Sequence, residues 1–249
     1  MILRILRSGV RWLGVVLGFL ILVPLHVLVA AAGRPNLVPP LFLGYMGRVA
    51  GLRVRTEGGP RHGALFLANH LSWLDIMVIA GATGAGFVSK DDVAGWPMIG
   101  WLARLNNTVF VARTERKAVR GQADALRSAL ASGQPVALFP EGTTAGGAEI
   151  LPFRASLLSS LFPPLPHVKV QPVALDYGPA AGEIAWVGDE PAKANAARIL
   201  SRKGTLPVTV HFLEPVDPAA AADRKMLAQR SRAEIFEALA GSEPQPDRL

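Results

Sequence analysis

The chain contains no cysteine among its 249 residues, which excludes disulfide bonds, thiolate catalysis and cysteine-ligated metal sites. This absence is compatible with a reducing compartment without requiring one. Charged residues are also scarce, because they make up 18% of the chain whereas soluble domains carry about a quarter. Hydrophobic residues make up 50%, and the mean hydropathy is +0.31. This balance favours contact with a membrane.

Acidic residues are outnumbered, with 19 Asp and Glu against 26 Lys and Arg, so the formal net charge is +7. A basic chain favours nucleic acid, anionic lipid headgroups or an acidic protein as its partner. Nucleic-acid binding usually shows as clustered Lys and Arg interleaved with aromatic residues, but here the basic residues are scattered as singles and pairs. We therefore expect an anionic membrane surface as a partner and no nucleic acid.

A long hydrophobic run lies near the N-terminus, where residues 12–33 contain no Asp, Glu, Lys or Arg. About 20 apolar residues allow a helix to cross a bilayer, so a membrane-anchoring helix is predicted rather than a buried core helix. A secretory signal peptide is the alternative, although its apolar region is usually about 7–15 residues long. A second apolar run at residues 37–52 is compatible with a helical hairpin that dips into one leaflet.

From about Leu52 the sequence alternates between strand-like and helix-like segments. Short apolar runs predict strands at residues 64–68, 86–90, 107–113, 135–139, 168–175, 183–187 and 206–212. Helices are predicted at residues 71–82, at about 114–132 and from about 218 to 240. This alternation predicts an α/β fold with a mostly parallel central sheet flanked by helices.

A histidine and an aspartate follow the first of these strands, in the segment NHLSWLD, with four residues between His70 and Asp75. The pKa of an unperturbed histidine, about 6.5, suits proton transfer near neutral pH, and a carboxylate on one ring nitrogen holds such a base in one orientation. With His70 at the strand exit and Asp75 one turn into the helix, the two side chains can meet. The simpler interpretation is a helix start capped by Asn69 or Ser72, with His70 at the surface.

Two further segments carry polar residues where a predicted strand ends, which is where open α/β sheets bind ligands. In LFPEGTT, Glu141 is followed by Gly142, which lets the backbone approach a ligand, and by Thr143, whose hydroxyl can help to bind an anion. In NTVFVAR, Arg113 could hold a phosphate or carboxylate through two hydrogen bonds. Taken singly, these segments are also explained as a Pro-Glu-Gly turn and as an arginine paired with Glu115.

Together and in this order, the three segments resemble the glycerolipid acyltransferase family, typified by bacterial 1-acylglycerol-3-phosphate acyltransferase. NHLSWLD matches the first sequence block of that family, and residues 139–143, FPEGT, match the third in full. The second block, Gly-x-x-Phe-x-x-Arg, is matched by Phe110 and Arg113, but Asn107 stands where glycine is usual. Residues 170–173, VQPV, resemble the fourth block. Bacterial lyso-ornithine lipid acyltransferases are similar as well.

The resemblance covers residues 52 to 213 approximately and divides the chain into a membrane anchor, residues 1–50, and an acyltransferase domain, residues 51–249. It implies that His70 is the general base that removes the proton of an acceptor hydroxyl, and that Asp75 orients it. It further implies that the acceptor's polar head is bound by a set of four residues, namely Arg113, Glu141, Gly142 and Thr143. No covalent enzyme intermediate is required.

The reaction implied is transfer of a fatty acyl group from acyl-CoA or acyl carrier protein to lysophosphatidic acid, forming phosphatidic acid. The alternatives are the same transfer to lyso-ornithine lipid, a hydrolase that uses the same base, and a non-catalytic lipid-binding protein. We expect no cofactor and no metal, because no pair of the other histidines has metal-ligand spacing on one element. The acyl donors are cytoplasmic, so we expect the cytoplasmic face of a bacterial inner membrane rather than export.

A second membrane contact is predicted at residues 88–105, where Trp96 and Trp101 lie in an apolar stretch between Lys90 and Arg104. Tryptophan favours the membrane interface. Packing of the same residues into the core is the alternative.

Overall fold

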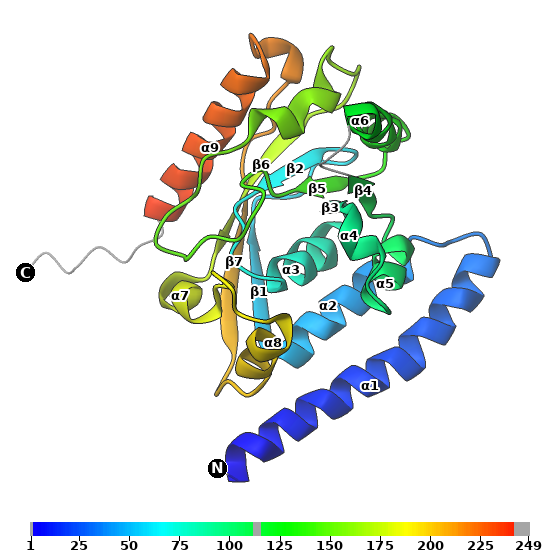
Figure 1. The fold of residues 1–249 in the computed structure, drawn as a ribbon, viewed down its shortest axis with the longest axis vertical. Coiled ribbons are helices and arrows are strands. Elements are labelled where there is room, and N and C mark those ends of the chain that lie inside the picture. The colour runs from blue at the N-terminus through cyan, green and yellow to red at the C-terminus, as the bar shows by residue number, and fades with distance from the viewer. Residues whose placement is uncertain (1, 112–115, 242–249) are drawn as a thin grey trace, which may run out of the picture.

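A seven-stranded sheet forms the centre of the molecule in the computed structural model, which describes residues 2–111 and 116–241 (Figure 1). Its strands are β1 (Leu52–Glu57), β2 (Leu65–Ala68), β3 (Gly86–Lys90), β4 (Val109–Val111), β5 (Val136–Leu138), β6 (Val170–Asp176) and β7 (Leu206–Phe212). They lie in the order β1–β7–β6–β2–β5–β3–β4, and every neighbouring pair is parallel except β6 and β7. The expected α/β fold with a mostly parallel sheet is confirmed.

Helices cover both faces of the sheet. The α-helices are α1 (Ile2–Ala31), α2 (Val38–Ala50), α3 (Leu74–Thr83), α4 (Asp91–Ala94), α5 (Ile99–Leu105), α6 (Arg116–Ala131), α7 (Ala181–Ile184), α8 (Ala192–Leu200) and α9 (Arg224–Gly241). Short 3₁₀ helices are η1 (Ala155–Leu161), η2 (Gly178–Ala180) and η3 (Pro218–Ala220).

The central strand β2 shows how the two layers form, because side chains alternate between the faces of a strand. Leu65 and Leu67 pack with residues of α6, η1 and α9, whereas Phe66 and Ala68 pack with residues of α3 and α8. All four residues are buried, as expected for a parallel strand covered on both faces.

The sequence-based expectation missed the helices α4, α5 and α8, and it differs from the structure in two strands. β1 was not predicted, because it is an edge strand beside β7 whose residues after Leu52 are exposed, so it lacks the apolar pattern of a buried strand. The strand predicted at residues 183–187 is wrong, because α7 occupies the first part of this segment. The N–H of Trp186 then donates to the carbonyl oxygen of Leu71 at 2.8 Å instead of entering a sheet. The segment therefore covers the loop after β2.

The two N-terminal apolar runs form a helical hairpin, in which α1 is followed by α2 (Figure 1). The Tyr45 hydroxyl of α2 donates to the carbonyl oxygen of Gly14 in α1 at 3.0 Å. α2 also packs on α3, where a Cβ added to Gly81 would lie 2.9 Å from the Gly44 Cα. Only glycine allows so close an approach of two helix backbones. α2 thus contacts the α/β layers as well as α1, and the domain boundary at residue 50 stays a prediction.

The outward face of α1 is apolar. Among the described residues, α1 is the one helix that is long and apolar enough to cross a membrane by length and composition. Its exposed large hydrophobic side chains are Leu6, Val10, Trp12, Leu13, Val16, Leu17, Leu20, Ile21, Leu25, Val27 and Leu28. An exposed apolar surface of this extent indicates membrane association.

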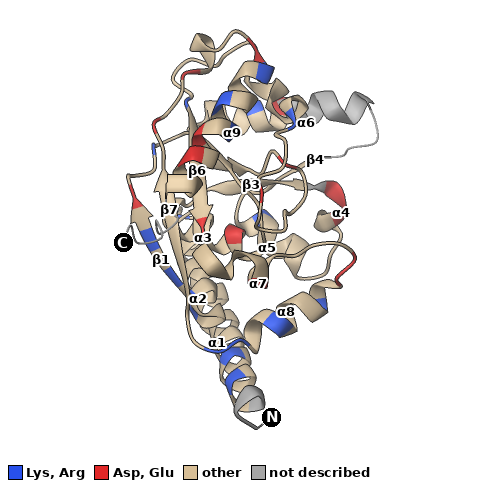
Figure 2. Cartoon of the chain, turned by 90° about the vertical axis from the view of Figure 1, so that its left-hand side faces the viewer, with Lys and Arg blue, Asp and Glu red and all other residues tan. Residues whose placement is uncertain are grey.

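Basic side chains attach the first part of α1 to the rest of the molecule. The guanidinium of Arg11 donates to the carbonyl oxygens of Ile199, Leu200 and Gly204, each at 3.1 Å. Figure 2 shows Lys and Arg on α1 and α8 at the lower end of the molecule, and further basic residues on β1, α6 and α9. The basic residues near α1 can face anionic headgroups beside the apolar helix.

Candidate active site

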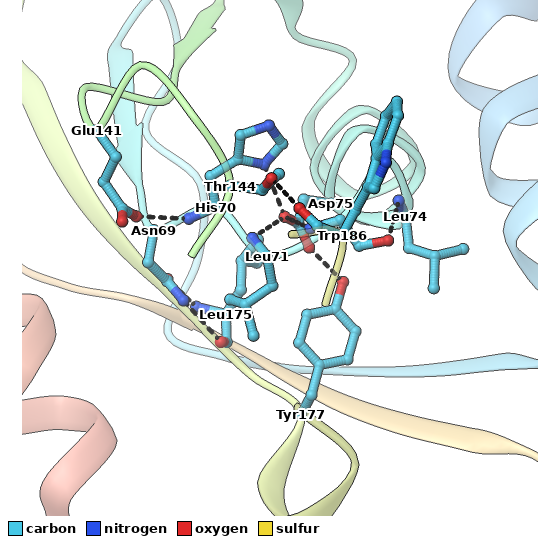
Figure 3. Close-up of polar contacts among 11 residues, drawn as sticks. Asn69, His70, Leu71, Leu74, Asp75, Glu141, Thr144, Leu175, Tyr177 and Trp186 are labelled. Atoms are coloured by element: carbon cyan, nitrogen blue, oxygen red, sulfur yellow. Dashed lines mark hydrogen bonds and ion pairs between the residues drawn. The ribbon is translucent and has the colours of Figure 1, made fainter. Parts of the chain in front are cut away.

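Three loops meet at the carboxyl-terminal ends of the central strands, because β2 lies between two strands that run parallel to it. β5 pairs with β2 on one side and β6 on the other, so the carboxyl ends of all three strands lie together. His70 follows β2, residues 139–145 follow β5, and Tyr177 follows β6. Figure 3 shows side chains from these three loops converging around Asp75 and His70.

The expected contact between His70 and Asp75 is confirmed. His70 Nδ1 and Asp75 Oδ2 are 2.8 Å apart (Figure 3). The Asp75 side chain is fully buried, whereas 18% of the His70 side chain is exposed. Because Nδ1 faces a carboxylate, Nδ1 carries the proton and Nε2 is the nitrogen that can accept one. The pair is arranged as a base and its orienting carboxylate.

The carboxylate of Asp75 is held from every side. Its Oδ2 also accepts hydrogen bonds from the backbone N–H groups of Leu71 at 2.7 Å and Ser72 at 2.8 Å. Its Oδ1 accepts a hydrogen bond from the Tyr177 hydroxyl at 2.7 Å. These hydrogen bonds leave neither oxygen of the buried carboxylate without a donor. The helix start at α3 is thus built mainly around Asp75, and Ser72 Oγ adds a longer hydrogen bond from the Leu74 N–H at 3.5 Å.

The loop after β5 holds His70 through its backbone. Glu141 Oε1 accepts a hydrogen bond from the His70 N–H at 2.7 Å, and Oε2 accepts one from the Leu151 N–H at 2.9 Å. The Ala145 N–H donates to the carbonyl oxygen of His70 at 2.7 Å. Only 2% of Glu141 is exposed, and this burial raises its pKa to about 7. Glu141 therefore joins two loops of the site.

Aromatic rings fix the plane of the imidazole. The His70 ring stacks on Phe139, with 4.0 Å between ring centroids and 11° between planes. Phe139 in turn stacks on Phe87 of β3, with centroids 5.9 Å apart. An imidazole supported in this way is held in one orientation.

The three remaining predicted site residues, Gly142, Thr143 and Arg113, differ in how much the structure shows of them. Gly142 has a φ of 73°, in the left-handed region that favours glycine, and the side chain of Arg154 packs 3.2 Å from the position of a Cβ added there. Thr143 is exposed beside it, so it can reach a ligand. Arg113 lies outside the described residues. The roles assigned to all six residues stay predictions.

Two residues near the site were not found from the sequence. Tyr177 directly follows β6, and a polar residue at the end of a parallel strand was the available signal. Arg154 is exposed, and its backbone N–H donates to the carbonyl oxygen of Pro140 at 2.8 Å, which keeps it beside the loop after β5. In the described part of the chain, no group of three or more His, Cys, Asp or Glu could hold a metal ion.

Asn107, which stands where the second block usually has glycine, has a φ of 53°. Glycine adopts this left-handed conformation without cost, and asparagine is among the few other residues that tolerate it. The Asn107 side chain also donates to Asn36 Oδ1 at 2.8 Å. Asparagine is therefore compatible with the left-handed backbone conformation found at this position.

Comparison with known proteins decides the family, because the sequence model of the Acyltransferase family matches residues 49–176. The chain belongs to the acyltransferase family. It is 36% identical over 231 residues to the lyso-ornithine lipid O-acyltransferase of Brucella abortus, covering 85% of this chain and 86% of that protein. It is 33% identical over 195 residues to the 1-acyl-sn-glycerol-3-phosphate acyltransferase of Neisseria gonorrhoeae, covering 74% of each chain.

A solved structure has the same fold as this acyltransferase. The crystal structure of the 1-acyl-sn-glycerophosphate (LPA) acyltransferase, PlsC, from Thermotoga maritima superposes with a TM-score of 0.73. The alignment covers 98% of each chain at 20% sequence identity, so it shows the fold alone. The resemblance to glycerolipid acyltransferases is thus confirmed, and this chain is an acyltransferase of lipid biosynthesis.

Proposed function

We propose that this enzyme transfers a fatty acyl group from a thioester to the hydroxyl of a lysophospholipid-like acceptor, with His70 as general base. The observation that carries the proposal is the 2.8 Å contact between His70 Nδ1 and Asp75 Oδ2. It leaves Nε2 of a partly exposed imidazole to meet a substrate, while the orienting carboxylate is fully buried.

The proposed reaction is a direct transfer. Nε2 of His70 takes the proton of the acceptor hydroxyl as its oxygen attacks the thioester carbonyl carbon. The Asp75 anion stabilises the imidazolium that forms. The C–S bond then breaks, and the leaving thiolate takes the proton back from His70, directly or through a water molecule. The products are an ester and a free thiol, and the enzyme returns to its starting state without a covalent intermediate.

The acceptor's headgroup is proposed to bind over the loop after β5. Gly142 and Thr143 lie there, and we assign Arg113 to the same role from its sequence block. Arg154 adds a guanidinium packed against Gly142, and guanidinium groups bind phosphate and carboxylate through paired hydrogen bonds. Direct contact of Glu141 with the acceptor stays a prediction. Its two carboxylate oxygens accept hydrogen bonds from the backbone N–H groups of His70 and Leu151, which supports a role in shaping the loop after β5.

The relatives divide between two acceptors. Proteins from Brucella abortus and Rhizobium meliloti, 36% and 37% identical, are named lyso-ornithine lipid O-acyltransferases. The relative from Neisseria gonorrhoeae, at 33%, is named a 1-acyl-sn-glycerol-3-phosphate acyltransferase. We therefore propose lyso-ornithine lipid as the acceptor, with lysophosphatidic acid as the second candidate. Each carries an anionic group that a guanidinium can bind.

The proposed location is the cytoplasmic face of a bacterial inner membrane. The exposed apolar face of α1 supports membrane attachment. The thioester donors, acyl-CoA and acyl carrier protein, are cytoplasmic, so an exported enzyme would lack its co-substrate. The positive charge of the chain suits both an anionic membrane surface and an acidic carrier protein.

The test is acyl transfer by the purified protein in detergent. Lyso-ornithine lipid and lysophosphatidic acid are offered in parallel, each with acyl-CoA and with acyl carrier protein as donor. Wild type should form a diacyl product, and His70→Ala should lose about 100- to 10,000-fold in rate, the usual contribution of a general base. A His70→Ala variant that keeps the wild-type rate would rule out the mechanism. Release of free fatty acid without acceptor indicates a hydrolase, and lysolipid binding without turnover indicates a binding protein.

A further inference from the structure

We infer that Tyr177 is a positioning residue for catalysis, which completes a His70–Asp75–Tyr177 hydrogen-bond network. The inference rests on the proposed function, in which His70 is the base. Tyr177 acts on Asp75 and does not touch the substrate.

The contact is short and buried. The Tyr177 hydroxyl donates to Asp75 Oδ1 at 2.7 Å, and 2% of Tyr177 is exposed. The three other hydrogen bonds on this carboxylate, from His70, Leu71 and Ser72, all reach Oδ2. In the described part of the chain, Tyr177 is thus the donor that holds Oδ1. Two oxygens held by different loops fix the rotation of the carboxylate, and with it the direction of Oδ2 toward His70.

The backbone keeps Tyr177 in place. The Asn69 amide donates to the carbonyl oxygen of Leu175 at 3.1 Å, and its Oδ1 accepts the Leu175 N–H at 2.8 Å. This pair of bonds joins the end of β2 to the end of β6, one residue before His70 and two residues before Tyr177. The Tyr177 hydroxyl is consequently held at a constant distance from the helix start that carries Asp75.

The hydroxyl remains a donor over the pH range of catalysis. Burial raises the pKa of Tyr177 well above its ordinary value, and the neighbouring Asp75 anion raises it further. Two other titratable groups of the site lie in these loops. His70 contacts Asp75 Oδ2 and Glu141 contacts the backbone N–H of His70, so in these contacts neither meets the Tyr177 hydroxyl. Without the hydroxyl, a buried carboxylate oxygen would lack a partner, and Asp75 could turn away from His70.

The chain offers a matched control, because it has only two tyrosines. Tyr45 donates to the carbonyl oxygen of Gly14 at 3.0 Å, between α1 and α2 and away from the site. Tyr177→Phe and Tyr45→Phe therefore remove the same group and one hydrogen bond each. A merely structural effect of losing a buried hydroxyl would lower thermal stability without changing turnover by the folded enzyme.

The experiment is steady-state acyl transfer by wild type and both variants, with folded protein counted by thermal unfolding. Tyr177→Phe should lower kcat by about 10- to 100-fold, as for loss of a hydrogen bond to a charged group, while the acceptor KM stays within about twofold. Tyr45→Phe should keep the wild-type kcat. Equal kcat in the two variants, or a loss that appears in KM alone, overturns the inference. If wild type itself transfers no acyl group, the proposed function has failed, and the inference fails with it.

A second measurement does not depend on whether Tyr177→Phe folds. In Tyr45→Phe, Tyr177 is the one remaining tyrosine, so its ionisation can be followed by ultraviolet absorbance. Tyr177 should ionise only as the protein unfolds at high pH. Ionisation of the folded protein near the ordinary tyrosine pKa of about 10 would show that the hydroxyl is not buried against Asp75, and the inference would be overturned.

Discussion

The carboxylate of Glu141 accepts a hydrogen bond from the backbone N–H of His70 at 2.7 Å, although the two residues are 71 positions apart in the chain. Asp75 holds the imidazole of the same histidine. The proposed base is thus fixed through its main chain by the loop after β5 and through its side chain by α3. The contact with Asp75 is local to the junction between β2 and α3, but the contact with Glu141 is not, so the position of His70 also depends on how the loop after β5 packs against this junction.

The stability of the protein should depend on pH through Glu141. Burial raises the pKa of this carboxyl from its ordinary value near 4.5 to about 7. Between these values the folded state holds more protons than the unfolded state, so the free energy of unfolding falls as pH rises through this window. The glutamine in Glu141→Gln cannot ionise, so this variant lacks the pH dependence of the free energy of unfolding that Glu141 causes. Relative to wild type, its free energy of unfolding should therefore rise by up to about 3 kcal/mol between about pH 5 and about pH 7.5.

Urea unfolding of both proteins in the same detergent, at both pH values, measures this difference. The glutamine retains one acceptor oxygen for the two N–H groups, so a constant offset between the proteins is expected at every pH. The prediction concerns the change in that offset. An offset that does not vary with pH would mean that Glu141 titrates near its ordinary pKa.

Arg154 should contribute to binding of the anionic acceptor. Its guanidinium packs against Gly142, and its backbone is tied to Pro140. Arg154→Ala should raise the acceptor KM by about tenfold through the loss of a hydrogen bond to a charged group, with kcat changed much less. Arg154→Lys keeps the charge but loses the paired hydrogen bonds of the guanidinium, so its acceptor KM should lie between those of wild type and Arg154→Ala. Steady-state kinetics with each candidate acceptor measures the effect, and an unchanged KM in Arg154→Ala would place the headgroup elsewhere.

Trp96 and Trp101 should contact the membrane. Their side chains are 44% and 43% exposed, which argues against the alternative of core packing, and the nearby Met98 and Ile99 are exposed as well. Replacing both tryptophans with alanine should weaken binding to vesicles that contain anionic lipid, because aromatic side chains favour the interface. Vesicle flotation at several lipid concentrations measures this.

Phe236→Ala is the matched control for the tryptophan variant, since Phe236 is 55% exposed on α9, which lies away from α1 and α5 in Figure 1. This control should bind vesicles like wild type. Both variants should keep the thermal unfolding midpoint of wild type. Equal vesicle binding by all three proteins would show that Trp96 and Trp101 do not contribute to the membrane contact.

Local sequence patterns predicted the central contact of the candidate site. His70 and Asp75 are separated by four residues across one strand–helix junction, so their contact depends on a single turn of chain. The strands at residues 86–90 and 206–212 were also predicted correctly, because their apolar residues are continuous or alternate. β1 could not be predicted in this way, since its side chains after Leu52 face solvent at the sheet edge.

The sequence by itself predicted the fold class, the family, the proposed base with its carboxylate, and an apolar N-terminal helix, since each rests on patterns along the chain and needs no knowledge of which segments pack together. Only the tertiary structure decided that β2 lies between β5 and β6, which brings Glu141 and Tyr177 to opposite sides of the His70–Asp75 pair. Tyr177 reaches Asp75 across 102 residues. No local pattern encodes such a contact, because strand order results from the packing of both sheet faces at once.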